Sequence, residues 1–324
     1  MTSPAQKVVD KYYPWLSGHW SFFIQRLEAD RLAHALLIRG PAGCGKTALA
    51  SAMVARLLCV ENQAQACGQC RSCKLYPGGA HPDYFDLQPE EDSEVIKVDQ
   101  VRDLISRLNL TTFISERKVA YIYPAECMNA AAANALLKSL EEPAGNTVLI
   151  LVSDNPGRLP VTILSRCQAI DVAQPDHQQV QDWLESSSGK PSNEVSAALQ
   201  AAGGSPLRAA RYLDSPEMDA YGQVREGLAT LLSRPGSVSL VSSQLGELNP
   251  VDLWRWLSMC SSDILKSVMV GTPLDWLPAG VKLQDKTLLQ LQRRADINRQ
   301  LSATPIRGDL LLQDWLIRWA EQTI

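Results

Sequence analysis

Residues 40–47 read Gly-Pro-Ala-Gly-Cys-Gly-Lys-Thr, which is the G-x-x-x-x-G-K-[ST] pattern of a phosphate-binding loop. An apolar run at 35–38 precedes this stretch, and a helical run at 48–58 follows it. In that context, backbone N–H groups at the positive end of a helix surround the phosphates of a nucleotide. A fortuitous glycine-rich turn is the alternative. The candidate nucleotide ligands are Gly40, Gly43, Gly45, Lys46 and Thr47.

The two polar side chains of this loop have different expected roles. The Lys46 ammonium is expected on the β- and γ-phosphate oxygens, and the Thr47 hydroxyl on a Mg²⁺ ion. A hydrolytic site also needs an acid at the end of a following strand to hold Mg²⁺, and a second acid to orient the attacking water. The strand expected at 118–123 is instead followed by Pro124, and Glu126 lies beyond the proline. We therefore expect ATP or ADP to bind with little or no hydrolysis.

The pattern around the loop predicts an α/β layer. Buried-strand candidates at 35–38, 118–123 and 147–152 are separated by helical segments. Apolar side chains recur at helical spacing behind Asp99, a residue type that favours the N-cap, so a helix is expected over 99–109. Such alternation is typical of a parallel sheet covered by helices.

Beyond residue 174 the strand-like runs stop, and the rest of the chain is expected to be helical. The expected division is an α/β domain at 1–172, a small helical domain at 173–214 and an all-helical domain at 215–324. Most of the tryptophans fall after the α/β layer. Their large apolar rings are expected to anchor the packing of these helices.

Four of the eight cysteines form the spacing C-x₇-C-x₂-C-x₂-C. Cys59, Cys67, Cys70 and Cys73 offer four soft thiolate ligands, which suit one tetrahedral Zn²⁺ ion with no open coordination position. A site of this kind is structural rather than catalytic. Free thiols in a loop and an iron–sulfur cluster are the alternatives.

Charge and composition limit the functional classes. Hydrophobic residues make up 45% and charged residues 20% of the chain, which are ordinary globular values. The formal net charge of −4 argues against a protein that coats nucleic acid by itself, because phosphate neutralisation needs a clustered basic surface. No apolar run approaches the ~18 residues that span a bilayer, and the first residues show no signal or lipidation motif. A cytoplasmic protein with no membrane partner is expected.

Two further stretches carry a family resemblance. Residues 134–143 read Asn-Ala-Leu-Leu-Lys-Ser-Leu-Glu-Glu-Pro, and residues 159–167 read Leu-Pro-Val-Thr-Ile-Leu-Ser-Arg-Cys. They resemble the helix and the S-R-C motif of AAA+ clamp-loader subunits, and the four-cysteine insert is typical of bacterial ones. With Tyr-Pro-Trp-Leu at 13–16 and His-Pro-Asp-Tyr at 81–84, the pattern is similar to that of the delta-prime type in DNA polymerase III. The resemblance is dense over 13–172 and diffuse beyond.

The resemblance implies a fold and an assembly. The fold is a AAA+ phosphate-loop domain with a parallel sheet and a zinc-binding insert at 59–73, followed by a helical lid and an all-α collar domain for oligomerisation. The assembly is a pentameric ring with gamma/tau and delta subunits, which holds ATP between neighbours, opens a sliding clamp and places it on primed DNA. The chain would then be a component of the polymerase III holoenzyme without a polymerase site of its own.

The resemblance also assigns roles to single residues. The arginine of S-R-C, here Arg166, completes the ATP site of the adjacent subunit as an arginine finger in that family. Arg208 resembles the lid arginine that contacts the γ-phosphate, and Ser153 or Asp154 stands where these ATPases place a polar sensor. Hydrolysing members have adjacent Asp and Glu where this chain has Tyr123 and Pro124.

Two other functions stay open. A catalytically active gamma/tau-type ATPase subunit would share the loop, the cysteines and S-R-C, although residues 123 and 124 weigh against it. A nucleotide-switched adaptor without a DNA role is the second alternative function.

Basic side chains near the helix that lines the channel in related rings are candidate DNA contacts, and a solvated face explains them equally well. These are Arg102, Arg107, Arg117 and Lys118.

Overall fold

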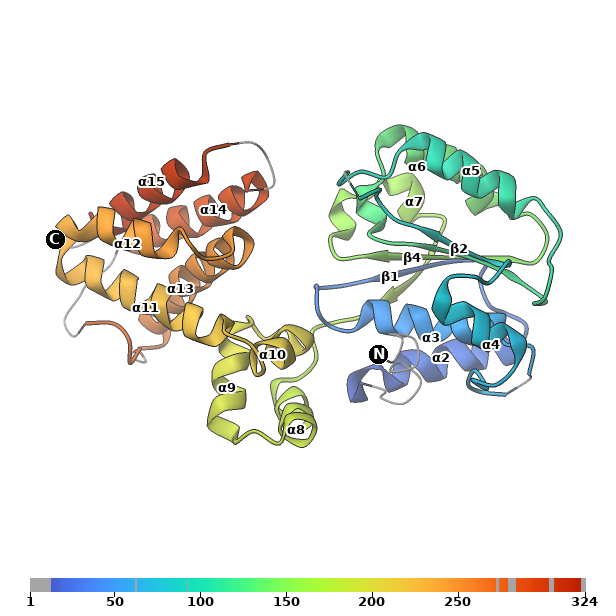
Figure 1. Cartoon of the computed structure of the whole chain (residues 1–324), viewed down its shortest axis with the longest axis horizontal. Helices are drawn as coiled ribbons and strands as arrows, with labels where there is room; N and C mark the ends of the chain where they lie inside the picture. The colour runs from blue at the N-terminus through green and yellow to red at the C-terminus, as the bar shows by residue number, and fades with distance from the viewer. Residues whose placement is uncertain are drawn as a thin grey trace. The chain divides into compact units, whose positions relative to one another are not determined.

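The chain forms two compact units (Figure 1), and each contains buried hydrophobic side chains. The first unit extends to Gly189 and includes Ser205–Leu207, and the second comprises Lys190–Gly204 and the residues from Arg208 onward. The computed structural model describes residues 13–61, 63–91, 93–271, 274–278, 284–302 and 306–321.

The first unit is built on a sheet of five strands in the order β2-β3-β4-β1-β5. Every pair of neighbouring strands is parallel. The predicted parallel α/β layer and its three strands are therefore confirmed. The strands are β1 (Ala35–Arg39), β2 (Tyr84–Leu87), β3 (Lys118–Ile122), β4 (Thr147–Ser153) and β5 (Gln168–Asp171).

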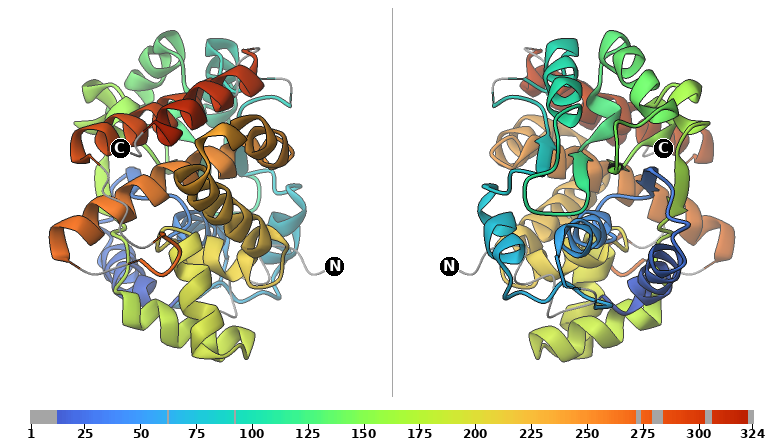
Figure 2. Two further views of the ribbon diagram at one scale, coloured as in Figure 1. Left: turned by 90° about the vertical axis from the view of Figure 1, so that its left-hand side faces the viewer. Right: turned by 90° about the vertical axis from the view of Figure 1, so that its right-hand side faces the viewer.

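Helices cover both faces of this sheet (Figure 1 and Figure 2). One face carries α2 (Ser17–Glu28), α3 (Lys46–Leu58) and α4 (Arg71–Leu75). The other face carries α5 (Val98–Leu108), α6 (Ala130–Glu141) and α7 (Val161–Leu164). Successive side chains of a strand point to opposite faces, so each strand contributes to two cores.

The central strand β1 shows how the two cores are separated. Leu36 and Ile38 pack with the buried side chains of α3, whereas Leu37 packs with those of α5 and α6. Each of these three side chains is at most 1% exposed, and burying such a side chain contributes about 1.5–3 kcal/mol. A strand buried on both faces reads as a continuous apolar run, which is why the sequence pattern predicts it.

Helix α5 differs from the sequence prediction at its start. The N-cap is Lys97 and not Asp99, so that prediction is wrong. The Lys97 backbone N–H donates to Gln100 Oε1 at 2.8 Å, and Gln100 therefore supplies the side-chain acceptor at this helix end. Asp99 lies in the first turn, where its carboxylate interacts favourably with the positive end of the helix.

The remaining elements of the first unit are short, apart from α8 (His177–Ser188). The 3₁₀ turns are η1 (Pro14–Leu16), η2 (Tyr76–Gly78), η3 (Ala125–Cys127) and η4 (Pro156–Arg158).

The second unit is helical throughout its described residues, as the sequence predicts. Buried tryptophans hold its helices together, and the indole N–H groups of Trp256, Trp315 and Trp319 each donate to a backbone carbonyl. No helix in the described part of the chain is long and apolar enough to cross a membrane. Its elements are α9 (Ser192–Ala201), α10 (Pro206–Tyr212), α11 (Glu217–Ser233), η5 (Pro235–Ser237), α12 (Val238–Leu245), α13 (Pro250–Val270), α14 (Asp285–Leu301) and α15 (Gly308–Ala320), with the first two residues of α10 counted in the first unit.

Candidate nucleotide site and metal centre

The phosphate loop lies between β1 and α3, the context that the motif requires. Gly40, Gly43 and Gly45 have φ values of 150°, 79° and 88°, in the region that side chains rarely adopt. A Cβ at Gly40 would lie 1.9 Å from the carbonyl oxygen of Val172, which follows β5. Only glycine therefore fits at the start of the loop.

Five consecutive carbonyls of the loop accept hydrogen bonds from outside the cradle or from its own helix. These hydrogen bonds fix the backbone conformation of the loop, and an anion cradle requires such a fixed backbone. The donor–acceptor pairs are Lys46 Nζ to Pro41 O (2.6 Å), Ser205 Oγ to Ala42 O (3.3 Å), Leu207 N to Gly43 O (3.1 Å), Trp15 Nε1 to Cys44 O (2.9 Å) and Leu49 N to Gly45 O (3.0 Å).

An aromatic cluster packs against this loop. The Tyr13 and Trp15 rings are stacked with centroids 5.2 Å apart, and Trp183 meets both edge-on. A Cβ at Gly45 would lie 2.8 Å from a Tyr13 ring carbon, so the aromatic ring touches the loop backbone. The loop is thus held in one conformation by apolar contacts as well as by hydrogen bonds.

The loop lysine is engaged inside the protein. Lys46 is 3% exposed, and its Nζ lies 2.5 Å from Asp154 Oδ1 in addition to the bond to Pro41. Asp154 directly follows β4, which is the neighbour of β1. The sequence names this position only as a candidate sensor, and the pairing of the two side chains was not predicted.

The ends of β3 and β4 are joined by Tyr123 and Glu126. The Tyr123 hydroxyl donates to Asp154 Oδ2 at 3.3 Å, and burial, followed by the charges of Asp154 and Glu126, raises its pKa to about 12. Glu126 is 8% exposed, and its Oε1 accepts the backbone N–H groups of Asp154 and Asn155 at 3.0 and 2.9 Å. Glu126 therefore fixes the end of β4 through backbone contacts.

Arg166 lies at the surface between α7 and β5, with its side chain 33% exposed. Its Nε donates to Glu141 Oε1 at 2.6 Å, and a terminal nitrogen lies 2.5 Å from the same oxygen. The other terminal nitrogen donates to the carbonyl of Thr162 at 3.1 Å. Glu141, at the end of α6, was not predicted as a partner of this arginine.

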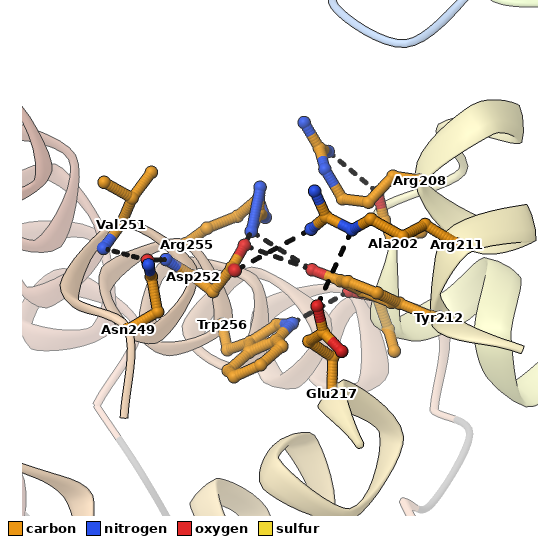
Figure 3. Close-up of polar contacts among 11 residues, drawn as sticks. Ala202, Arg208, Arg211, Tyr212, Glu217, Asn249, Val251, Asp252, Arg255 and Trp256 are labelled. Atoms are coloured by element: carbon orange, nitrogen blue, oxygen red, sulfur yellow. Dashed lines mark hydrogen bonds and ion pairs between the residues drawn. The ribbon is translucent and has the colours of Figure 1, made fainter. Parts of the chain in front are cut away.

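Arg208 belongs to the second unit, whereas the phosphate loop belongs to the first. A terminal nitrogen of Arg208 donates to the carbonyl of Ala202 at 3.2 Å (Figure 3). Nearby, Asp252 is paired with Arg255 and with Arg211. Burial, followed by the charges of Arg208, Arg299 and Arg211, lowers the pKa of Arg255 to about 10. The role of Arg208 towards a nucleotide stays a prediction.

The four predicted cysteine ligands come together at one place. The sulfurs of Cys59, Cys67, Cys70 and Cys73 all lie within 4.8 Å of one another, and none is in a disulfide. The Cys67 and Cys73 sulfurs are 3.9 Å apart. A tetrahedral site with Zn–S bonds of about 2.3 Å has sulfurs about 3.8 Å apart, so the donor set fits a metal ion.

Backbone amides support these sulfurs. Cys59 Sγ accepts the N–H of Cys67 at 3.4 Å, and Cys67 Sγ accepts that of Cys70 at 3.3 Å. Cys70 is the N-cap of α4, and its sulfur accepts the N–H of Cys73. The amides of Cys70 and Gln69 lower the pKa of Cys67 to about 7, which favours its thiolate, whereas burial raises the pKa of Cys59 and of Cys73.

A buried polar network lies behind the cysteines. Ser72 Oγ and Ser115 Oγ both donate to the carbonyl of Leu58 at 2.6 Å. The His81 Nδ1 accepts the N–H of Asp83 at 3.0 Å, so its Nε2 is the protonated nitrogen that donates to Ser72 Oγ at 2.7 Å. Burial lowers the pKa of His81 and keeps this ring neutral.

Asp83 completes the network from a fully buried position. Its carboxylate accepts the backbone N–H groups of Phe113, Ile114 and Ser115 at 2.7, 2.8 and 2.8 Å. The His-Pro-Asp-Tyr stretch at 81–84 therefore ties the cysteine insert to the segment before β3. The sequence shows the stretch at 81–84 as a motif, but it does not show that Asp83 binds residues 113–115, because these lie about thirty positions further along the chain.

The candidate DNA-contacting side chains are not equivalent. Lys118 is 4% exposed and its Nζ donates to the carbonyl of Leu108 at 2.7 Å, so its proposed DNA contact is wrong. Arg102, Arg107 and Arg117 are paired with Asp99, Asp103 and Asp30 at 3.1, 3.6 and 3.7 Å.

The family model and two relatives that match this chain all belong to DNA polymerase III. The family model for the DNA polymerase III delta subunit matches residues 16–176. The DNA polymerase III subunit delta' of Pseudomonas aeruginosa is 37% identical over 314 residues, which cover 96% of this chain and 91% of the relative. That of Escherichia coli is 35% identical and covers 79% of this chain and 77% of the relative.

One more distant relative and one solved structure are also similar to this chain. The tau/gamma subunit of Haemophilus influenzae is 34% identical over 159 residues, which cover 49% of this chain and 23% of the relative. The crystal structure of a gamma subunit-related protein from Thermotoga maritima covers 94% of this chain and 99% of its own, with 17% identity and a TM-score of 0.52. That likeness shows the fold alone.

Proposed function

Because the chain belongs to the family of DNA polymerase III delta' subunits, we propose that it is a clamp-loader subunit that binds nucleotide, hydrolyses it poorly, and donates Arg166 to a neighbour. The observation that carries the proposal is the surface guanidinium between α7 and β5, with its side chain 33% exposed. A permanently charged, planar group at a surface can stabilise the charge on a phosphoryl group that another subunit transfers.

The ends of the strands beside the phosphate loop support the hydrolysis part of the proposal. An attacking water must be oriented by an acid at the end of β3, and this chain has Tyr123 and Pro124 there. Glu126 is committed to two backbone N–H groups at the end of β4. Phosphate binding by the loop and Lys46 needs neither an acid that holds Mg²⁺ nor an acid that orients the attacking water.

Reconstitution with single-site variants tests the finger. Arg166→Ala should lower the ATPase rate of the assembled loader by about 10³-fold or more at the site it completes, while assembly is unchanged. Arg39→Ala is a matched control, because Arg39 is also 33% exposed and is paired with Asp171 at 2.5 Å. An ATPase rate that is the same for both variants and the wild type would refute the role of Arg166.

The remaining assignments complete the proposal. We propose Zn²⁺ as a structural ion on the four cysteines, Mg²⁺ on Thr47 when ATP or ADP is bound, and Arg208 as a lid contact to the nucleotide. Residues 1–172, 173–214 and 215–324 would act as AAA+ domain, lid and collar. The proposed partners are gamma/tau and delta subunits, with the sliding clamp and primed DNA reached through the complex in the cytoplasm.

An active gamma/tau-type ATPase is the nearest alternative, because a tau/gamma relative matches 49% of the chain. ATP turnover by the purified chain alone, at the rate of an ordinary AAA+ enzyme, would support that alternative. A nucleotide-switched adaptor without a DNA role is the other, and DNA-dependent assembly with a clamp would exclude it.

A further inference from the structure

Lys46 of the phosphate loop is buried, and it forms an ion pair with the half-buried Asp154. The Lys46 ammonium has three donors, and two of them are directed at Asp154 Oδ1 at 2.5 Å and Pro41 O at 2.6 Å. Its side chain is 2% exposed, so water does not compete for it, and that of Asp154 is 24% exposed. The Asp154 carboxylate and the phosphate of a nucleotide are both anions, and both would pair with the Lys46 ammonium.

Asp154 is held in this position from several sides. Glu126 Oε1 accepts the N–H groups of Asp154 and Asn155, and Glu126 is itself 8% exposed. The Tyr123 hydroxyl donates to Asp154 Oδ2 at 3.3 Å, on the carboxylate oxygen that does not face the lysine. These contacts preorganise the carboxylate and leave its Oδ1 to Lys46.

We propose that Asp154 is a resident counter-ion of the phosphate loop, which competes with a nucleoside di- or triphosphate for Lys46 and thereby keeps nucleotide affinity low. This inference rests on the nucleotide-binding part of the proposed function. Phosphate must displace the carboxylate before it reaches the ammonium, and the chain is then left with Asp154 unpaired beside an incoming anion. Like charges at close range in a partly buried site disfavour the bound state.

A metal-free binding assay tests the competition directly. In EDTA, Asp154→Asn should bind ADP about tenfold more tightly than the wild type, which corresponds to about 1.4 kcal/mol. Asparagine keeps an acceptor for Lys46 and removes the charge. Asp171→Asn is the matched control, because Asp171 ends β5 at the same edge of the sheet and is paired with Arg39; its ADP affinity should equal that of the wild type.

A second variant keeps the test open if Asp154→Asn does not fold. Tyr123→Phe removes one contact that holds the carboxylate, and it should tighten ADP binding by about two- to threefold. Equal or weaker metal-free ADP binding in both variants would overturn the inference, and so would a loss of affinity only when Mg²⁺ is present, because Asp154 would then act as a metal ligand.

The ADP-binding test of Asp154 can fail or succeed independently of the ATPase test of Arg166. If neither the wild type nor Asp154→Asn binds ADP at any concentration, the counter-ion inference fails. The effect of Arg166→Ala on the assembled loader would still decide the clamp-loader function independently. If ADP binding tightens as expected and Arg166→Ala has no effect, the finger role fails while the counter-ion stands.

Discussion

Replacing Asp83 by alanine should destabilise the first unit through three backbone amides at once. The carboxylate is fully buried and accepts the N–H groups of Phe113, Ile114 and Ser115. A hydrogen bond to a charged group contributes about 1.5–3 kcal/mol, and water that enters the vacated space offsets part of the loss. We therefore expect the free energy of unfolding to fall by about 3–5 kcal/mol.

Urea unfolding followed by tryptophan fluorescence measures this loss, and hydrogen exchange at 113–115 localises it. Asp83→Asn keeps one oxygen acceptor and should lose about half as much. Asp86→Ala is the control, because Asp86 is exposed and, among the described residues, its carboxylate accepts a hydrogen bond from the Gln88 side chain alone; this variant should change stability by less than about 0.5 kcal/mol. A loss below about 1 kcal/mol in Asp83→Ala, with unchanged exchange at the three amides, would refute the reasoning.

Three further predictions concern the metal, pH and the helical unit. Chelation, or Cys67→Ser, should lower the Tm of the first unit and the zinc content measured by atomic absorption, because metal binding is coupled to folding. The pKa of His81 is lower in the folded chain than in the unfolded chain, so the unfolded chain binds a proton at a higher pH. The free energy of unfolding should therefore fall as the pH drops below about 6.5. Unfolding compared at pH 7.5 and 5.5 should show a smaller fall in His81→Gln than in the wild type. Trp319→Ala should cost about 3–5 kcal/mol in urea unfolding, because its buried ring is 0% exposed and its indole N–H donates to Leu228 O.

The sequence predicts the interior of the sheet better than its edges. The strands β1, β3 and β4 are covered on both faces and therefore read as apolar runs. The strands β2 and β5 lie at the two edges of the sheet, and each carries an exposed aspartate, Asp86 or Asp171. An edge strand with one partner and polar side chains gives no apolar run, and the pattern missed both.

Local motifs were predictable, and long-range pairs were not. The phosphate loop and the cysteine spacing each lie within one short stretch, so the sequence alone names their residues. Lys46 and Asp154, by contrast, meet only because β1 and β4 are neighbours in the sheet, and Arg166 meets Glu141 only because α6 and α7 pack together. The same limit explains the wrong DNA prediction for Lys118, whose burial follows from its contact with α5.

The glycine at position 40 has a meaning that is independent of any nucleotide. Its missing side chain makes room for the Val172 carbonyl, where the chain leaves the strand that starts directly after the S-R-C motif. A related protein that no longer binds a nucleotide could have other residues at positions 46 and 47. A larger residue at position 40 would instead clash with the Val172 carbonyl, displace β5 and so move Arg166, which precedes that strand by two residues. We therefore expect this one glycine to persist in relatives whose loop has otherwise decayed, as a mark of the scaffold and not of the ligand.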